Sequence, residues 1–392
     1  MSGQVRPERR SWLAHAPAAA LALSATPALA AETVSWSVAY TADVVGGWSD
    51  DVSTRGRFLD NLDVVADVDL ERAFGWNGAT LHGHLLNNSG EAPNDDLGTL
   101  QGVDNIEVSD QHLRLFEFWV EQAFGGGSIR AGLYDLNSEF YSNESAGLLI
   151  APAFGIGSEL AATGPNGPSI FPSTALAVRA RFDVSERQSV MLAVLNASAG
   201  VFGDPEGVDT DFDHGVLVIG EYGWRDSFNF NVGAWTYSDD QDDIRDLDGL
   251  GEPMQRRAFG AYATYERPLS EQATGFVRIG VSDGDTTSYS SGWQAGVLIE
   301  SPLASRPDSQ MSFGAYQGRF SDKHRDNEFD LGVDVADAET GLEFTYSDQI
   351  TPWLRVQPDL QLILDPGGDR DRDDLWVAGL RIEITPPWGG GS

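Results

Sequence analysis

The strongest constraint on this chain is an alternation of apolar and polar side chains with a period of two. In residues 61–71, "NLDVVADVDLE", Val64, Ala66 and Val68 fall on one side and Asp63 and Asp67 on the other. Successive side chains of a β-strand point to opposite faces, so this segment is expected to be a strand with one apolar and one polar face. An acidic face cannot line a dry protein core, so the two faces must meet different solvents.

The same pattern recurs in about sixteen segments. They lie at 33–40, 61–71, 79–86, 113–124, 128–135, 174–184, 189–196, 214–224, 228–237, 257–266, 274–282, 291–300, 309–318, 339–347, 353–364 and 375–385. A transmembrane barrel strand needs only about 9 to 11 tilted residues, whereas a membrane helix needs about 20 apolar residues in a row. The pattern therefore favours strands as the membrane-crossing elements.

The connections between these segments alternate between short and long. Short joins include "GGG" at 125–127 and "SER" at 185–187, whereas long joins cover about 88–111, 136–174 and 238–255. Such alternation is typical of outer-membrane proteins. We therefore predict an all-β fold: a transmembrane antiparallel β-barrel of about 16 strands, with short periplasmic turns and long acidic extracellular loops.

The N-terminus has the pattern of an export signal. A basic "RPERR" precedes an apolar stretch, and "ALA" ends at Ala30, as expected for cleavage there. Residues 1–30 are predicted to be a signal peptide and 31–392 a single barrel domain. The signal segment carries three Arg and one Glu, so the mature chain would hold 22 basic and 59 acidic residues, a formal net charge of −37. A charge of this sign should repel nucleic acid.

The sequence also contains residue patterns that catalytic or metal sites use. Cysteine is absent, which excludes thiol chemistry. His82 and His84 share a strand face, but no third ligand is apparent from the sequence, so no metal site is expected. Asp67 and Asp69 have a spacing that inverting glycosidases use, although nothing nearby suggests a raised pKa. We expect a protein that is not an enzyme and needs no cofactor, with a secreted soluble β-protein or glycosidase as the less favoured alternative.

Three stretches resemble a known family. They are "DLERAFGWNGATLHGHLLNNSG" at 69–90, "LRLFEFWVEQAFGGGSIRAGLYDLNSEFYSNESAGLLIAPAFG" at 113–155 and "GPNGPSIFPSTALAVRARF" at 164–182. All three resemble the OprB-type carbohydrate-selective porins of Gram-negative outer membranes. The resemblance implies a sixteen-stranded porin through which monosaccharides and similar small solutes cross the outer membrane, with arginine and acidic side chains at its constriction.

Candidate pore-lining residues follow from the strand faces. Arg130 and Tyr134 are expected to face an aqueous pore, and Ala131 and Leu133 to face lipid. Folding 116–124 onto 128–135 about the "GGG" turn, with opposed residue numbers summing to 253, places Trp119 opposite Tyr134 and Glu121 opposite Gly132. The predicted sugar constriction comprises Arg130, Arg179, Arg181, Glu117, Glu121, Trp119 and Tyr134.

Charge and loop composition also bear on function. The acidic balance also suits a general cation-preferring diffusion porin, and carboxylates of the long loops could bind divalent cations beside lipopolysaccharide phosphates. The loop at about 137–173 contains "GLLIAPAFGIG", which is too apolar for a wholly solvated loop, so it is expected to fold inward and narrow the pore. Either a monomer or a homotrimer is compatible with the sequence. Trp388 precedes a final "GGGS", whereas barrels of this kind usually end on an aromatic residue.

Overall fold

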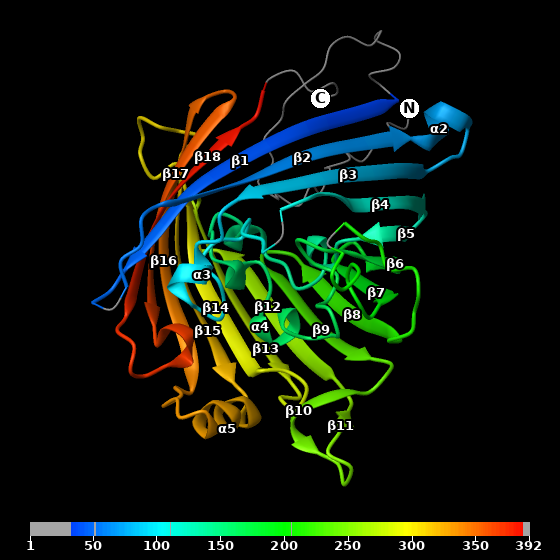
Figure 1. The fold of residues 1–392 in the computed structure, drawn as a ribbon. Coiled ribbons are helices and arrows are strands. Elements are labelled where there is room, and N and C mark those ends of the chain that lie inside the picture. Colours follow the sequence, from blue (N-terminus) through cyan, green and yellow to red (C-terminus); the bar gives the residue numbers. More distant parts are fainter. Residues whose placement is uncertain (1–32, 51, 110, 205, 387–392) are drawn as a thin grey trace, which may run out of the picture.

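A computed structural model describes residues 33–386 except 51, 110 and 205, and it contains one closed antiparallel β-barrel (Figure 1). Each strand of the barrel pairs with the barrel strands that precede and follow it in the sequence. The first barrel strand pairs with the last and closes the barrel. All sixteen predicted segments are barrel strands, which confirms the predicted fold class. The predicted signal peptide, Trp388 and the final "GGGS" lie outside the described residues.

The strands of the barrel are β1 (Val34–Trp48), β2 (Arg57–Asp69), β3 (Ala79–Gly90), β4 (Leu113–Phe124), β5 (Gly127–Tyr134), β6 (Ala175–Ser185), β7 (Gln188–Asn196), β8 (Val216–Arg225), β9 (Asn229–Tyr237), β12 (Phe259–Pro268), β13 (Ala273–Ser282), β14 (Tyr289–Glu300), β15 (Gln310–Phe320), β16 (Ala338–Thr351), β17 (Leu354–Leu364) and β18 (Leu375–Ile384). The strands β10 (Gln241–Leu247) and β11 (Pro253–Arg256) form a separate hairpin, so β9 pairs with β12.

The helices are short and lie in the connections. They are α2 (Leu70–Phe74), α3 (Asn94–Leu97), α4 (Ser158–Ala161) and α5 (Asp322–Asp330), with 3-10 turns η1 (Leu136–Ser138), η2 (Glu144–Ala146), η3 (Pro152–Phe154) and η4 (Pro366–Gly368). Among the described residues, no helix has the length and apolar character needed to cross a membrane.

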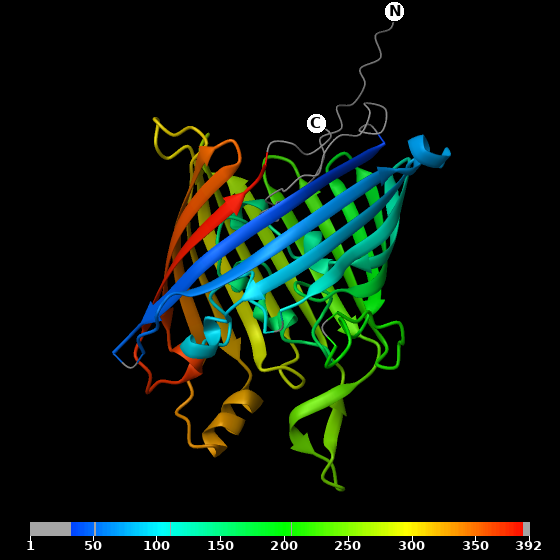
Figure 2. The same ribbon diagram turned by 45° about the horizontal axis from the view of Figure 1, so that its top comes forward.

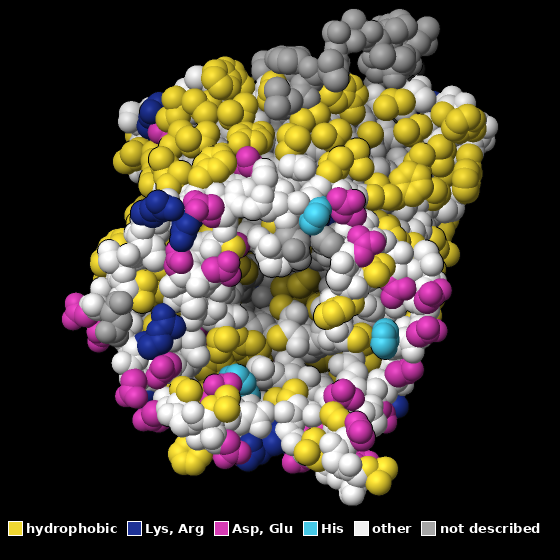
Figure 3. All heavy atoms as spheres, in the orientation of Figure 1, with side chains coloured by type: hydrophobic (Ala, Val, Ile, Leu, Met, Phe, Trp, Pro, Cys, Tyr) yellow, Lys and Arg dark blue, Asp and Glu magenta, His cyan; other side chains and the backbone are white. Residues whose placement is uncertain are grey.

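The barrel has an apolar outer face and a polar inner face. On β6, Val178 is 53% exposed, whereas its neighbour Arg179 is only 1% exposed; on β13, Ile279 and Arg278 show the same contrast. Hydrophobic side chains cover the upper part of the view in Figure 3, and a hollow below them is surrounded by many acidic side chains. A membrane barrel requires this distribution, because its outer face meets lipid and its lumen meets water.

The two ends of the barrel differ (Figure 2). The start of β1 and the end of β18 lie at the same end as α2, whereas α5 and the β10–β11 hairpin project from the other end. The helix α2 occupies part of the β2–β3 connection and includes residues 70 and 71, which were predicted to end the second strand. Asp69 caps it by accepting a hydrogen bond from the Arg72 backbone N–H at 3.1 Å, and Gly75, at φ 74°, ends it.

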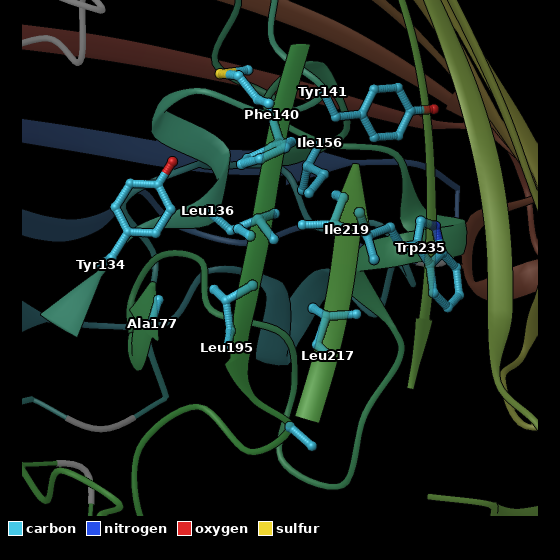
Figure 4. Packing of buried hydrophobic residues seen from close by; sticks show 14 of the residues in the cluster. Tyr134, Leu136, Phe140, Tyr141, Ile156, Ala177, Leu195, Leu217, Ile219 and Trp235 are labelled. Atoms are coloured by element: carbon cyan, nitrogen blue, oxygen red, sulfur yellow. The ribbon is translucent and has the colours of Figure 1, made fainter. Parts of the chain in front are cut away.

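The long connection between β5 and β6 folds into the barrel, as predicted. Its residues Leu136, Phe140 and Tyr141 have none of their surface exposed, and they pack with Leu195 and Leu217 of β7 and β8 (Figure 4). Burial of such side chains stabilises this arrangement by about 25 cal/mol per Å² of apolar surface removed from water. We call residues 135–174 the inward loop.

A second connection also folds inward, which the sequence analysis did not predict. Residues 91–112 except 110, between β3 and β4, bury Leu97 and Val103 completely. The backbone N–H groups of Leu100 and Gln101 each donate to the carboxylate of Glu339 on β16, at 2.9 Å. We call this segment the second inward loop. Two connections therefore fill part of the lumen.

Candidate functional site in the barrel lumen

Two arginines and two glutamates form a compact charged cluster on the lumen wall. Arg130 of β5 and Arg179 of β6 are directly paired residues. Arg130 Nη2 lies 2.7 Å from Glu121 Oε2, and Arg179 Nε lies 2.7 Å from Glu139 Oε2. The two remaining links, Arg130 to Glu139 and Arg179 to Glu121, measure 3.4 and 3.2 Å. We call these four residues the lumen charge cluster; its formal charges sum to zero.

The two arginines of this cluster differ in exposure. The Arg179 side chain is 1% exposed and its guanidinium also donates to Ser128 Oγ at 2.7 Å, so its donors are directed at protein groups. The Arg130 side chain is 13% exposed, and those of Glu121 and Glu139 are 22% and 21% exposed. Arg179 therefore holds the two carboxylates in place, whereas the other three side chains remain partly exposed.

Trp119 supports Arg130 through its indole ring. The Arg130 guanidinium carbon lies 3.7 Å from the ring centroid, within the range of a cation–π contact. On the neighbouring strand, the His82 ring stacks on the same indole at 4.4 Å with an interplanar angle of 8°. Trp119 is only 8% exposed. It thus fixes the orientation of Arg130, and little of the indole is left for stacking on a solute.

The β4–β5 register differs from the predicted one. Opposed residue numbers sum to 251 rather than 253, so Trp119 faces Gly132 and Glu121 faces Arg130 directly. The physical reason is a tighter turn: Phe124 pairs with Gly127 around only Gly125 and Gly126, and Gly126 has φ 91°. Two-residue hairpin turns need such positive φ values, which glycine supplies.

The register also explains a glycine on β5. Gly132 has φ 141°, and a Cβ atom at this position would lie 2.2 Å from the carbonyl oxygen of Phe118. A side chain there would push β4 and β5 apart beside Trp119. Gly132 therefore allows the close strand approach that brings Glu121 opposite Arg130.

Two residues that were predicted to be exposed are buried. Leu133 was expected to face lipid, but it is 3% exposed and lines a small crevice with Pro172 and Val208. Tyr134 does lie on the lumen side, but it is 1% exposed because the inward loop covers it, and its hydroxyl donates to Glu139 Oε2 at 2.7 Å. Ala131 is exposed on the outer side, as predicted.

Glu117 and Arg181 have different surroundings. Glu117 joins the same region, since its Oε1 accepts hydrogen bonds from Trp119 Nε1 and from the Asp135 backbone N–H, both at 3.1 Å. Arg181 pairs with Asp183 of its own strand at 3.1 Å rather than with the lumen charge cluster. The strand pairing thus brings six of the seven predicted residues together.

Glu139 was missed by the sequence analysis. It lies in the inward loop, in the motif "RAGLYDLNSEF" that also contains Arg130. The apolar run in this loop predicts that the loop folds inward. An acidic side chain carried inward with it needs a cationic partner, and this requirement could have identified Glu139. Arg179 and Arg130 supply that partner.

Polar side chains of the opposite wall hold the inward loop. Arg278 of β13 is fully buried and donates to the backbone carbonyls of Tyr141, Ala153 and Gly155, at 3.2, 2.9 and 2.9 Å. Glu343 of β16 accepts from the backbone N–H groups of Ile150 and Ala151. The loop therefore crosses the lumen and is attached on both sides, which fixes the space left for solutes.

A closed antiparallel barrel with an apolar outer face, a charged lumen and an inward loop defines a porin of the Gram-negative outer membrane. The family model described as "Carbohydrate-selective porin, OprB family" matches residues 54–385. The chain belongs to this family, and the protein is an outer-membrane porin for carbohydrates.

Individual relatives agree with this assignment. Porin B of Pseudomonas aeruginosa is 22% identical over 389 residues, which cover 88% of this chain and 85% of the relative. A shorter match, 28% identical over 120 residues, is to a putative porin QuiX of Acinetobacter baylyi and covers 27% of each chain. The high-pH structure of Pseudomonas putida OprB has a TM-score of 0.80 at 19% identity, covering 91% of this chain and 95% of that one. This last similarity supports the fold.

Proposed function

We propose that the protein mediates passive diffusion of monosaccharides and similar small neutral solutes, and that the lumen charge cluster is the part of the wall that they contact. The observation that carries the proposal is the unequal exposure of the cluster. The side chains of Glu121, Glu139 and Arg130 are 22%, 21% and 13% exposed, whereas that of Arg179 is 1% exposed. Donors and acceptors thus lie side by side on one patch of wall.

This arrangement suits a sugar hydroxyl, which both donates and accepts hydrogen bonds. Arg130 would donate to a hydroxyl oxygen, and the Glu121 or Glu139 carboxylate would accept from a hydroxyl hydrogen. Each such bond replaces one to water and contributes roughly 1 kcal/mol net, which is weak enough for the solute to leave again. Arg181, 31% exposed on the same face of β6, would extend the polar wall towards the short turns.

A general cation-preferring pore is the rival within the same class. The excess of acidic over basic residues in the chain supports it, because negative charge at the pore entrance would concentrate cations there. The lumen charge cluster supports the sugar proposal instead, since two arginines neutralise its two carboxylates and leave little field to attract an ion. Oligomeric state and cation binding by the loops stay predictions of the sequence.

Liposome swelling tests the proposal. Proteoliposomes should admit glucose or xylose faster than amino acids of similar size, and Arg130→Met should remove most of that advantage by deleting the exposed donor. Arg257→Met is the matched control. Arg257 pairs with Asp240 at 3.0 Å, and it lies in the exposed connection between the β10–β11 hairpin and β12. If sugars and amino acids of equal size entered the parent protein's proteoliposomes at equal rates, the sugar proposal would be wrong and the protein would be a general pore.

A further inference from the structure

Two histidines and a glutamate on neighbouring lumen strands bring three ligand atoms together. His82 and His84 lie two residues apart on β3, and Glu117 on β4 is the direct partner of His84. One ligand atom from each of the three side chains lies within 4.8 Å of the other two. The sequence analysis expected no metal site for want of a third ligand, and the strand register supplies one.

The hydrogen bonds of these residues leave one ligand atom of each available. His82 Nδ1 lies 2.8 Å from Asp67 Oδ1, while its Nε2 is buried, has no hydrogen-bond partner among the described residues and lies 3.7 Å from Glu117 Oε2. His84 Nε2 lies 2.8 Å from Asp63 Oδ1, which leaves Nδ1. Both hydrogen bonds of Glu117 go to Oε1, which leaves Oε2.

This is the hydrogen-bond pattern of metal-binding histidines. A carboxylate on one ring nitrogen fixes the tautomer and ring orientation and makes the other nitrogen a better ligand. Here both histidines have such a carboxylate, Asp67 for His82 and Asp63 for His84. Stacking of the His82 ring on Trp119 and edge-on contact of His84 with Phe116 further restrict the two rings.

We propose that His82, His84 and Glu117 bind a divalent transition-metal ion such as Zn²⁺ on the lumen wall. Two imidazoles and one carboxylate suit this class of ion, whereas Ca²⁺ takes six to eight oxygen ligands. Ligands about 2.0–2.2 Å from Zn²⁺ lie within roughly 3.5 Å of one another, so small side-chain rotations close the site. Water or a passing solute would complete the coordination.

Metal binding would also reach the lumen charge cluster. Glu117 Oε1 accepts from Trp119, and Trp119 supports Arg130. A bound dication would therefore add positive charge close to Arg130 and reduce the passage of cations relative to anions. This effect on ion passage is separate from sugar diffusion, so the two proposals can fail independently.

The test uses untagged full-length protein in detergent, stripped with a chelator and dialysed against Zn²⁺. We expect one tightly bound Zn²⁺ per chain, and Co²⁺ in its place should show the visible absorption of a low-coordinate nitrogen and oxygen site. His82→Ala and the isosteric Glu117→Gln should each weaken binding by about tenfold or more. His112→Ala is the matched control, because His112 forms an exposed pair with Glu206 at 3.0 Å.

Each result bears on the proposal. Failure of the parent protein to bind stoichiometric Zn²⁺ overturns it without any variant, whatever the swelling assay shows for sugars. Binding that survives both His82→Ala and Glu117→Gln, or that falls equally in His112→Ala, overturns it as well. Altered migration on gels with and without boiling confirms that each variant forms a folded barrel.

Discussion

Arg130 and Arg179 lie directly opposite each other on β5 and β6, and their guanidinium groups share the carboxylates of Glu121 and Glu139. Two like charges at paired positions repel unless they are neutralised. Glu121 comes from the neighbouring strand and Glu139 from the inward loop. The cluster therefore ties the loop to the wall at the place where solutes are proposed to pass.

Removing one carboxylate should change ion selectivity. Glu139→Gln keeps the size of the side chain but changes the formal charge of the cluster from zero to +1, so the pore should shift towards anions. The reversal potential in a KCl gradient measures this shift. Glu206→Gln, at an exposed loop glutamate, serves as the control for overall charge. Identical reversal potentials for the two variants would place the cluster away from the narrow part of the pore.

Deleting residues 146–168 should raise single-channel conductance. The segment contains α4 and buried residues such as Leu149 and Leu160, which occupy the lumen. Planar-bilayer recordings provide the measurement, and deletion of residues 248–252 at the tip of the β10–β11 hairpin is the control. A folded variant with the parent conductance would show that the inward loop does not limit flow.

Loss of Arg278 should loosen the inward loop. Arg278→Met leaves the carbonyls of Tyr141, Ala153 and Gly155 without their donor, at a cost of about 1–3 kcal/mol for each group that stays buried and unpaired. Hydrogen exchange of residues 141–155 should become faster and the open-channel current noisier. Exchange in the second inward loop provides an internal reference. Unchanged protection of residues 141–155 from hydrogen exchange would mean that Glu343 and the apolar packing hold the inward loop without Arg278.

The second inward loop should become less stable as pH rises. Burial raises the pKa of Glu107 to about 7, although the Asn94 backbone N–H donates to its carboxylate. A folded-state pKa above the usual value means that the folded loop favours the protonated form, so its stability falls as pH rises through about 4.5 to 7. Protection factors for 94–107, corrected for intrinsic exchange, should therefore drop between about pH 5.5 and 8. In Glu107→Gln this drop should become smaller, and a drop of equal size there would contradict the assignment.

The sequence alone predicted where each barrel strand lies and, for most of its side chains, the face on which they lie. All sixteen predicted segments are strands of the barrel, because alternation along a strand is a local property that does not depend on partners. The apolar run in 137–173 likewise predicted the inward loop, since exposed apolar surface is unfavourable.

Only the tertiary structure decided which side chains meet. A two-residue turn rather than a longer one set the pairing of Glu121 with Arg130, and the β3–β4 register brought Glu117 beside His84. Glu139 and Arg278 acquired their partners through contacts across the lumen. Such contacts join residues far apart in the chain, and a register change of one residue would move every side chain of a strand to the other face, so no local pattern specifies them.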